Sequence, residues 1–302
     1  MAHCDIAFPA FQAADRIEMA SEITLFAPVR VEPGVAELFF SALDGLAEHN
    51  DQIGFWFYDD NQDEQSRECL RRFVDRWSSR ATVLPPLELP RTDYSRAGSS
   101  HVWSNAGVAR VTAIKNHAIA SVLQSPSQHL FLVDADVVIR PDLVDHLSEV
   151  GADVISAVYW TQFAPSDPYL PNVWDFNGYD FEHSGSILAL RSPGHHRVGG
   201  LGACTLIHRR VLEAGVDFSP LPNLRLWGED RHFCIRAAAL GFDLVADSCL
   251  PPFHVYRESL VTSARTWVDD GMSPSWFADR WLTKGWEYAV KRMFGAPREA
   301  SA

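Results

Sequence analysis

The sequence predicts an α/β fold in which a mostly parallel central sheet carries helices on both faces. Short apolar runs alternate with patterns of helical period through the first half of the chain, as in repeated β-α units. Two of these apolar runs end in acidic turns. The chain has 302 residues, of which 47% are hydrophobic, so it can bury a large core in one or two domains.

The first half divides into successive β-α units. An apolar run, 23–27, precedes a helical pattern that starts at Pro33, a residue suited to the first turn of a helix. The next run, 53–58, leads through a polar turn into a second helical pattern. The expected strands are 23–27, 53–58, 82–84 and 129–133, and the expected helices are 33–49, 64–77, 107–123 and one that begins near residue 141.

The second half is less regular. Strands are expected at 154–159, 186–190 and 203–207, around a loop rich in Pro, Trp and Asn at 161–178. Tryptophans alternate with basic residues near the C-terminus, where we expect an amphipathic helix that docks on the core. The predicted division is an N-terminal arm, two halves of an α/β body and a C-terminal aromatic helical segment, with boundaries at 1–21, 22–150, 151–260 and 261–302.

Composition excludes several classes of protein. The net charge of −13, without a basic cluster, disfavours nucleic acid as a partner. The five cysteines are scattered, with no CxxC pair and no regular spacing to histidines, so we expect buried thiols in a reducing compartment. Acidic residues interrupt the N-terminal apolar stretch, and no run is long enough to span a bilayer. A soluble, cytoplasmic protein is expected.

The segment Asp134-Ala135-Asp136 follows an apolar strand. Alternation points its two carboxylates the same way, and hard oxygen ligands suit Mg²⁺ or Mn²⁺, which keeps positions free for substrate phosphates. Because ligands of parallel sheets bind beyond the carboxyl ends of strands, this segment and the turn at Asp59-Asp60 are expected to meet in one crevice. Such a triplet also occurs by chance, and solvated turn carboxylates are the plain alternative.

Taken in order, Asp59-Asp60-Asn61, Lys115-Asn116, Asp134-Ala135-Asp136 and Gly228-Glu229-Asp230 resemble the motifs of GT-A glycosyltransferases, particularly family 2. The resemblance spans residues 23–254. It implies a GT-A fold, Rossmann-like, with an acceptor-side extension: 22–150 would bind the nucleotide sugar, and 151–260 would hold the acceptor and the catalytic residues. It further implies a hexosyltransferase-like enzyme whose donor is a nucleotide-diphosphate sugar, with UDP or GDP as the nucleotide.

The resemblance also assigns roles to single residues. Asp60 would hydrogen-bond the nucleobase. Asp134 would support either the ribose or the metal. The other expected nucleotide-sugar contacts are Pro28, Arg30, Arg110 and Lys115, of which Lys115 replaces an arginine of the family and Arg110 competes for the same role. Pro28 and Arg30 depart from the family's usual sequence at the end of the first strand, so there the backbone is the expected contact.

The catalytic pair in this resemblance is Glu229 and Asp230, at the start of a helix, with Asp230 as the base that deprotonates the acceptor. The plain alternative is that both carboxylates favour the helix N-terminus through its dipole. His254 would join Asp136 and Asp134 around Mn²⁺ or Mg²⁺, whereas His195 and His196 lie in no such register. Inversion at the anomeric carbon is expected, although 134–141 and 171–174 also resemble retaining mannosyltransferases of the same fold.

Three matters stay open at this point. The acceptor could be a carbohydrate, a lipid-linked sugar, a peptide or a small molecule, and a lipid-linked acceptor would favour peripheral membrane contact by the C-terminal segment. A phosphatase of the haloacid dehalogenase type also places Asp-x-Asp after an apolar strand, but there the motif usually lies in the first strand. A non-catalytic sugar-nucleotide-binding protein is the third class.

Overall fold

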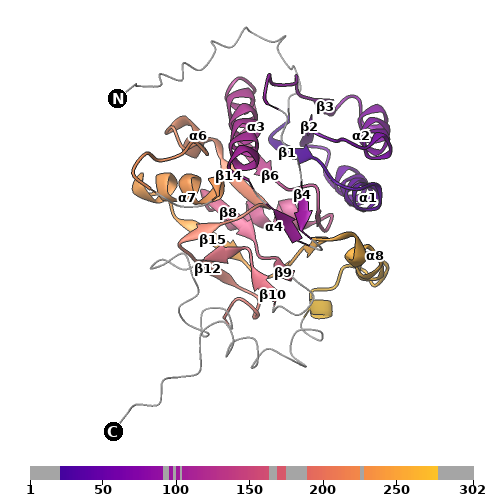
Figure 1. Ribbon diagram of the computed structural model, residues 1–302. Coiled ribbons are helices and arrows are strands. Elements are labelled where there is room, and N and C mark those ends of the chain that lie inside the picture. Colours follow the sequence, from indigo (N-terminus) through magenta and orange to yellow (C-terminus); the bar gives the residue numbers. More distant parts are fainter. Residues whose placement is uncertain are drawn as a thin grey trace.

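The computed structural model describes residues 21–90, 95–97, 100–102, 104–162, 169–174, 189–224 and 228–277. An eight-stranded sheet forms its centre, in the order β12-β15-β8-β14-β6-β1-β2-β3 (Figure 1). The strands are β1 Ile23–Val29, β2 Ile53–Asp59, β3 Ala81–Val83, β6 His129–Leu132, β8 Val154–Ala157, β12 His195–Arg197, β14 Thr205–His208 and β15 Leu244–Asp247. Only β12 and β14 of these eight run antiparallel to their neighbours, so the sheet is mostly parallel, as predicted.

Helices cover both faces of this sheet. They are α1 Pro33–His49, α2 Glu64–Arg76, α3 Asn105–Leu123, α4 Leu143–Val150, α6 Arg209–Glu213, α7 Glu229–Ala239, and α8 Val261–Asp269, which follows the 3₁₀ turn η1 Glu258–Leu260. One core cluster joins the sheet to α1, α2 and α4, and a second joins its other face to α3, α6 and α7. Figure 1 shows α1 and α2 on one side and α6 and α7 on the other.

Short strand pairs surround the central sheet. β7 Val137–Val138 pairs with β16 Phe253–His254, and β11 Val173–Trp174 pairs with β13 Gly200–Leu201. β9 Trp160–Gln162 pairs with β10 Tyr169–Pro171, and β4 Ser95–Ala97 pairs with β5 Ser100–Val102. The pairing of β7 with β16 brings His254 to the segment that follows β6.

Local signals place the helix starts where the sequence predicts them. Pro33 occupies the first turn of α1. Asp63 caps α2 by accepting hydrogen bonds from the backbone N–H groups of Gln65 and Ser66, which satisfies donors that a helix start leaves without partners. The predicted strand at 186–190 is wrong for Ala189 and Leu190, which are not in a strand, and residues 186–188 lie outside the described residues.

Residues 261–277 pack on the body of the protein. Trp267 is fully buried and Phe277 is 5% exposed, in a cluster with Val35 and Leu38 of α1. The rest of the predicted aromatic segment and almost all of the predicted N-terminal arm lie outside the described residues. Among the helices that the structure describes, none is both long and apolar enough to cross a membrane.

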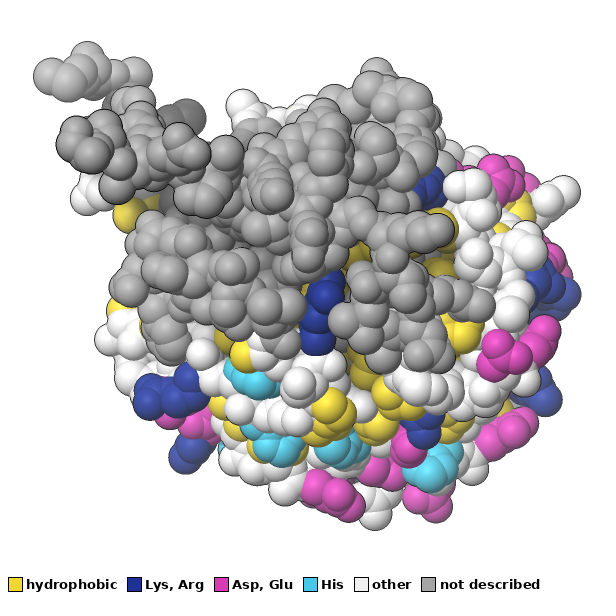
Figure 2. All heavy atoms as spheres, turned by 90° about the horizontal axis from the view of Figure 1, so that it is seen from below, with side chains coloured by type: hydrophobic (Ala, Val, Ile, Leu, Met, Phe, Trp, Pro, Cys, Tyr) yellow, Lys and Arg dark blue, Asp and Glu magenta, His cyan; other side chains and the backbone are white. Residues whose placement is uncertain are grey.

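Charged side chains are mixed on the face that Figure 2 shows. Over the described part of that face, basic side chains stand apart, and acidic side chains lie beside several of them.

Candidate active site

Most of the predicted site residues lie at the carboxyl edge of the parallel strands. Arg30 follows β1, Asp60 follows β2, and Asp134 and Asp136 follow β6. The neighbouring strand β14 runs antiparallel to β6. Helix α7, which opens with the Glu229-Asp230 pair, contacts α3. The topology therefore gathers motifs that are far apart in the sequence.

Asp60 lies between two arginines. The Arg110 side chain donates to both carboxylate oxygens of Asp60, from Nε at 3.1 and 3.0 Å and from Nη2 at 2.6 Å. Arg30 adds a contact at 3.4 Å. The hydrogen bond to Asp60 raises the pKa of Arg110 against the effect of burial. Three residues predicted to contact the nucleotide thus hold one another at the ends of β1 and β2.

Lys115 lies between the two carboxylates of the predicted catalytic pair. Its Nζ donates to Glu229 Oε1 at 2.8 Å and to Asp230 Oδ1 at 2.7 Å, and the lysine side chain is only 4% exposed. Burial favours the neutral amine, but the charges of Asp230, Glu229 and Asp134 outweigh it and raise the pKa of Lys115 well above its usual value. Its immediate partners are therefore the acidic pair.

Asp230 is poised to exchange a proton near neutrality. Burial raises its pKa to about 7, with Lys115 opposing the shift and Glu229 adding to it. Burial likewise raises the pKa of Asp134, against the effect of Lys115 and with the help of the nearby charge of Asp136. A carboxylate with a pKa near 7 can accept a proton at physiological pH, which is the property of an effective general base.

His254 lies beside Asp136, with 3.2 Å between Nε2 and Oδ2. Pairing of β16 with β7 sets this approach, and the backbone N–H of Val255 donates to the Asp136 carbonyl at 2.7 Å. On the other side of the ring, Nδ1 shares a hydrogen bond of 2.7 Å with the Thr161 hydroxyl. Such a partner orients an imidazole for a metal ion.

The donor chemistry of these residues suits a hard divalent cation. Two carboxylates, Asp134 and Asp136, and one imidazole, His254, are close enough that their charges affect one another. Carboxylates are the preferred ligands of Mg²⁺ and Mn²⁺, and Mn²⁺ also accepts imidazole. The donor set is thus the one that the resemblance implies for Mn²⁺ or Mg²⁺.

Two residues of this site, Tyr159 and Thr161, were not predicted from the sequence. The Tyr159 ring lies 4.8 Å from the His254 ring, centroid to centroid, and its phenol pKa is raised well above normal by burial and by the charges of Asp134, Asp136 and Asp230. Tyr159 follows β8, and Thr161 lies in β9. The position after a strand was the one available signal, and the aromatic residue there reads equally well as part of the core.

A small cavity is bordered by Asp134 and by the Lys115–Asp230 ion pair. Pro28, Lys115, Asp134 and Asp230 line it, together with apolar side chains of β6, β13, β14 and α7. Pro28 is thus beside Asp134 and Asp230, whereas Asp60 and its arginines do not line this cavity. The arrangement places Asp230, a candidate proton acceptor, and Asp134, a candidate cation ligand, around one space.

Known proteins match this chain by structure alone. No family model matches it, and no curated protein matches its sequence. The crystal structure of GalNAc-T7 with UDP, GalNAc and Mn²⁺ aligns with a TM-score of 0.51 at 15% identity, over 80% of this chain and 45% of that one. The Pyrobaculum calidifontis mannosyltransferase PcManGT, in complex with GDP-Man and Mn²⁺, aligns with a TM-score of 0.47 at 14% identity, over 77% of this chain and 56% of that one.

S. aureus TarS 1-349 in complex with UDP-GlcNAc aligns with a TM-score of 0.43 at 14% identity, over 77% of this chain and 58% of that one. The chain therefore spans about half the length of the solved structures that it matches. The alignment with GalNAc-T7 carries the conclusion about architecture, which is that the chain has the GT-A fold predicted from its sequence.

Proposed function

We propose that this protein is a metal-dependent, inverting glycosyltransferase that moves a sugar from a nucleotide-diphosphate sugar to an acceptor hydroxyl. The observation that carries the proposal is a small cavity lined both by Asp230, a carboxylate whose pKa burial raises to about 7, and by Asp134. The charges of Asp136 and His254 act on Asp134. A base for the acceptor hydroxyl and a cation beside the departing diphosphate would together serve glycosyl transfer by inversion. The GT-A fold supports the same reading by analogy.

Each residue has a defined task in this proposal. Asp230 accepts the proton of the acceptor hydroxyl as the new bond forms. Lys115 holds Asp230 and Glu229 in place through its two hydrogen bonds. Asp136 and His254 would hold Mn²⁺ or Mg²⁺, with Asp134 supporting it, and a cation bound there stabilises the negative charge of a departing diphosphate. Thr161 fixes the His254 ring.

The nucleotide is proposed to lie toward the ends of β1 and β2. Asp60 would accept a hydrogen bond from the nucleobase. The cationic side chains of Arg30 and Arg110 would lie near the nucleotide while they hold Asp60 in place. Pro28 would contribute through its backbone and its place in the cavity wall. UDP and GDP are the nucleotides to test first, and carbohydrates, lipid-linked sugars, peptides and small molecules are the acceptor classes.

A thermal-shift panel of UDP-, GDP- and dTDP-sugars, each with and without Mn²⁺, tests the proposal. A ligand at a hundred times its Kd adds about 2.7 kcal/mol of stability, so a bound donor is expected to raise Tm. The rise is expected only when Mn²⁺ is present, because the proposed site binds the diphosphate through the cation. Any stabilising donor is then tested for release of nucleoside diphosphate. Absence of metal-dependent stabilisation by every nucleotide sugar would contradict the proposal, and hydrolysis of simple phosphate esters that Asp134→Asn abolishes would support a phosphatase.

The pH profile tests the coupling between Lys115 and Asp230. In the native enzyme, kcat/KM is expected to fall as pH drops through about 7, because protonated Asp230 cannot accept a proton. Lys115→Met removes a positive charge that lowers the pKa of Asp230, so the acidic limb is expected to move to higher pH by about one unit or more.

The matched control for this experiment is Lys115→Arg, which keeps the positive charge and is expected to leave the acidic limb close to its native position. If the acidic limb of the Lys115→Met profile keeps its native position, the pKa measured in the profile does not belong to Asp230. Circular dichroism of each variant shows whether the fold survives the loss of the buried ammonium.

A further inference from the structure

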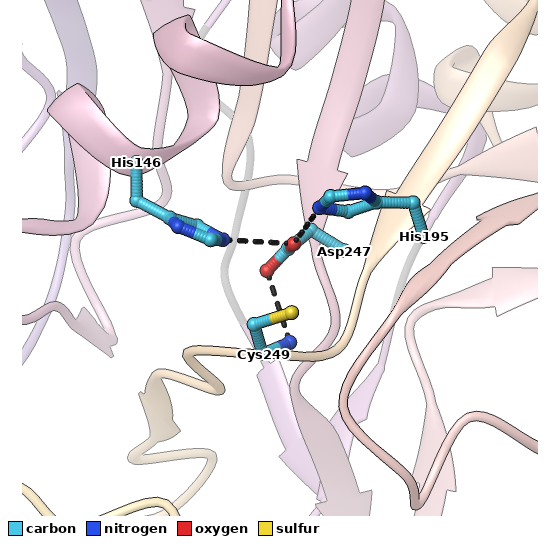
Figure 3. Close-up of side chains that lie close together, drawn as sticks. All are labelled: His146, His195, Asp247 and Cys249. Atoms are coloured by element: carbon cyan, nitrogen blue, oxygen red, sulfur yellow. Dashed lines mark hydrogen bonds and ion pairs between the residues drawn. The ribbon is translucent and has the colours of Figure 1, made fainter.

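A second group of metal-ligating side chains lies apart from the candidate active site. It consists of His146, His195, Asp247 and Cys249, and Figure 3 shows all four directed toward one point. His146 comes from α4, His195 from the edge strand β12, Asp247 from the end of β15, and Cys249 from the segment that follows. One donor atom from each residue lies within 4.8 Å of every other.

The carboxylate of Asp247 is the centre of this group and is fully buried. Nε2 of His146 lies 2.9 Å, and Nε2 of His195 lies 3.0 Å, from the same oxygen, Oδ2. The other oxygen accepts a hydrogen bond from the Cys249 backbone N–H at 3.1 Å. Two imidazoles from separate elements thus converge on one buried carboxylate oxygen, and the Cys249 thiol completes the group.

The geometry points to a structural zinc site formed by His146, His195, Asp247 and Cys249. Zn²⁺ takes imidazole nitrogen, thiolate sulfur and carboxylate oxygen in tetrahedral coordination, and sites with four protein ligands are structural. The set contains two nitrogens and one sulfur, which favour Zn²⁺ over Mg²⁺ or Mn²⁺. A zinc ion with one carboxylate and one thiolate forms a neutral centre, which suits the burial of Asp247.

The site has a definite mechanical role. It would tie α4 and the edge strand β12 to the end of β15, on the face of the sheet opposite α3 and α7. The chain continues from Cys249 through residues 250–253 to His254, so zinc would anchor the start of the segment that carries His254. The coordination itself depends only on the four ligands and does not rest on the proposed glycosyltransferase activity.

Zinc content of the full-length protein tests this inference. The purified chain is exposed to Zn²⁺ and dialysed to remove loosely bound metal. Its zinc content is then measured by inductively coupled plasma mass spectrometry. We expect stoichiometric zinc in the native protein and a lower Tm after chelation. His195→Gln is expected to lose the zinc although glutamine still offers Asp247 a hydrogen-bond donor, and this result separates metal binding from a purely hydrogen-bonded cluster.

His196→Gln is the matched control, because His196 lies next to His195 on β12 but binds the Ser248 hydroxyl at 3.1 Å instead; it should keep the zinc. Cobalt substitution gives a second readout: Co²⁺ should produce a thiolate-to-cobalt charge-transfer band that Cys249→Ser abolishes and Asp136→Ala retains. A native protein without tightly bound zinc, or zinc that persists in both His195→Gln and Cys249→Ser, would overturn the assignment.

Discussion

Asp230→Asn is expected to lower kcat by about 10²–10⁴-fold, the usual contribution of a positioned general base. Asparagine keeps the size of the side chain but cannot accept the acceptor's proton at neutral pH. The Asp230 carboxylate is 29% exposed, so an acceptor can reach it, while burial raises its pKa to about 7. The measurement is steady-state release of nucleoside diphosphate in the presence of an acceptor, with the donor found in the thermal-shift panel.

The donor should still stabilise Asp230→Asn in the presence of Mn²⁺, because the proposed metal ligands are unchanged. Asp243→Asn is the matched control, since Asp243 is an exposed partner of Arg197 away from this site, and its kcat should equal the native value. Transfer by Asp230→Asn at the native rate would remove Asp230 from the role of base. A product that retains the anomeric configuration of the donor would remove the inverting mechanism.

Asp136→Ala is expected to lower kcat/KM by at least about 10²-fold, because a bound cation contributes several kcal/mol to transition-state stabilisation and 1.36 kcal/mol corresponds to a factor of ten. The change removes the carboxylate that lies 3.2 Å from His254 Nε2. We expect the metal-dependent rise in Tm with donor to disappear as well. Calorimetric titration with Mn²⁺ in the presence of donor measures the loss directly.

Asp142→Ala is the control for this second variant. Asp142 lies on the same segment after β6, but its carboxylate pairs with Arg140, whose hydrogen bond lowers the pKa of Asp142. Activity and Mn²⁺ binding should therefore survive its removal. Unchanged Mn²⁺ affinity in Asp136→Ala would show that the cation does not bind at Asp136. The companion variant His254→Ala would then show whether the imidazole is needed for Mn²⁺ binding.

Local sequence patterns predicted a large part of the fold. The helix from Pro33 to His49 has the predicted bounds, because a proline at its start and a periodic apolar face are signals carried by residues close together in the chain. The strand that precedes Asp134 was predicted from a short apolar run, which is also a signal carried by neighbouring residues. The failure at Ala189 and Leu190 occurs where a short apolar run lacks such signals, since length and period do not distinguish a strand from other buried segments.

The sequence by itself determined the order of the elements and the chemical types at the ends of the strands, because these depend on neighbouring residues. Only the tertiary structure decided which of these side chains contact one another. Lys115 meets Asp230, and His195 meets Asp247, across long stretches of chain. Such contacts follow from the strand order of the sheet and from helix packing, which no local pattern encodes. Asp136 and His254, proposed from their motifs, were brought together by the same topology.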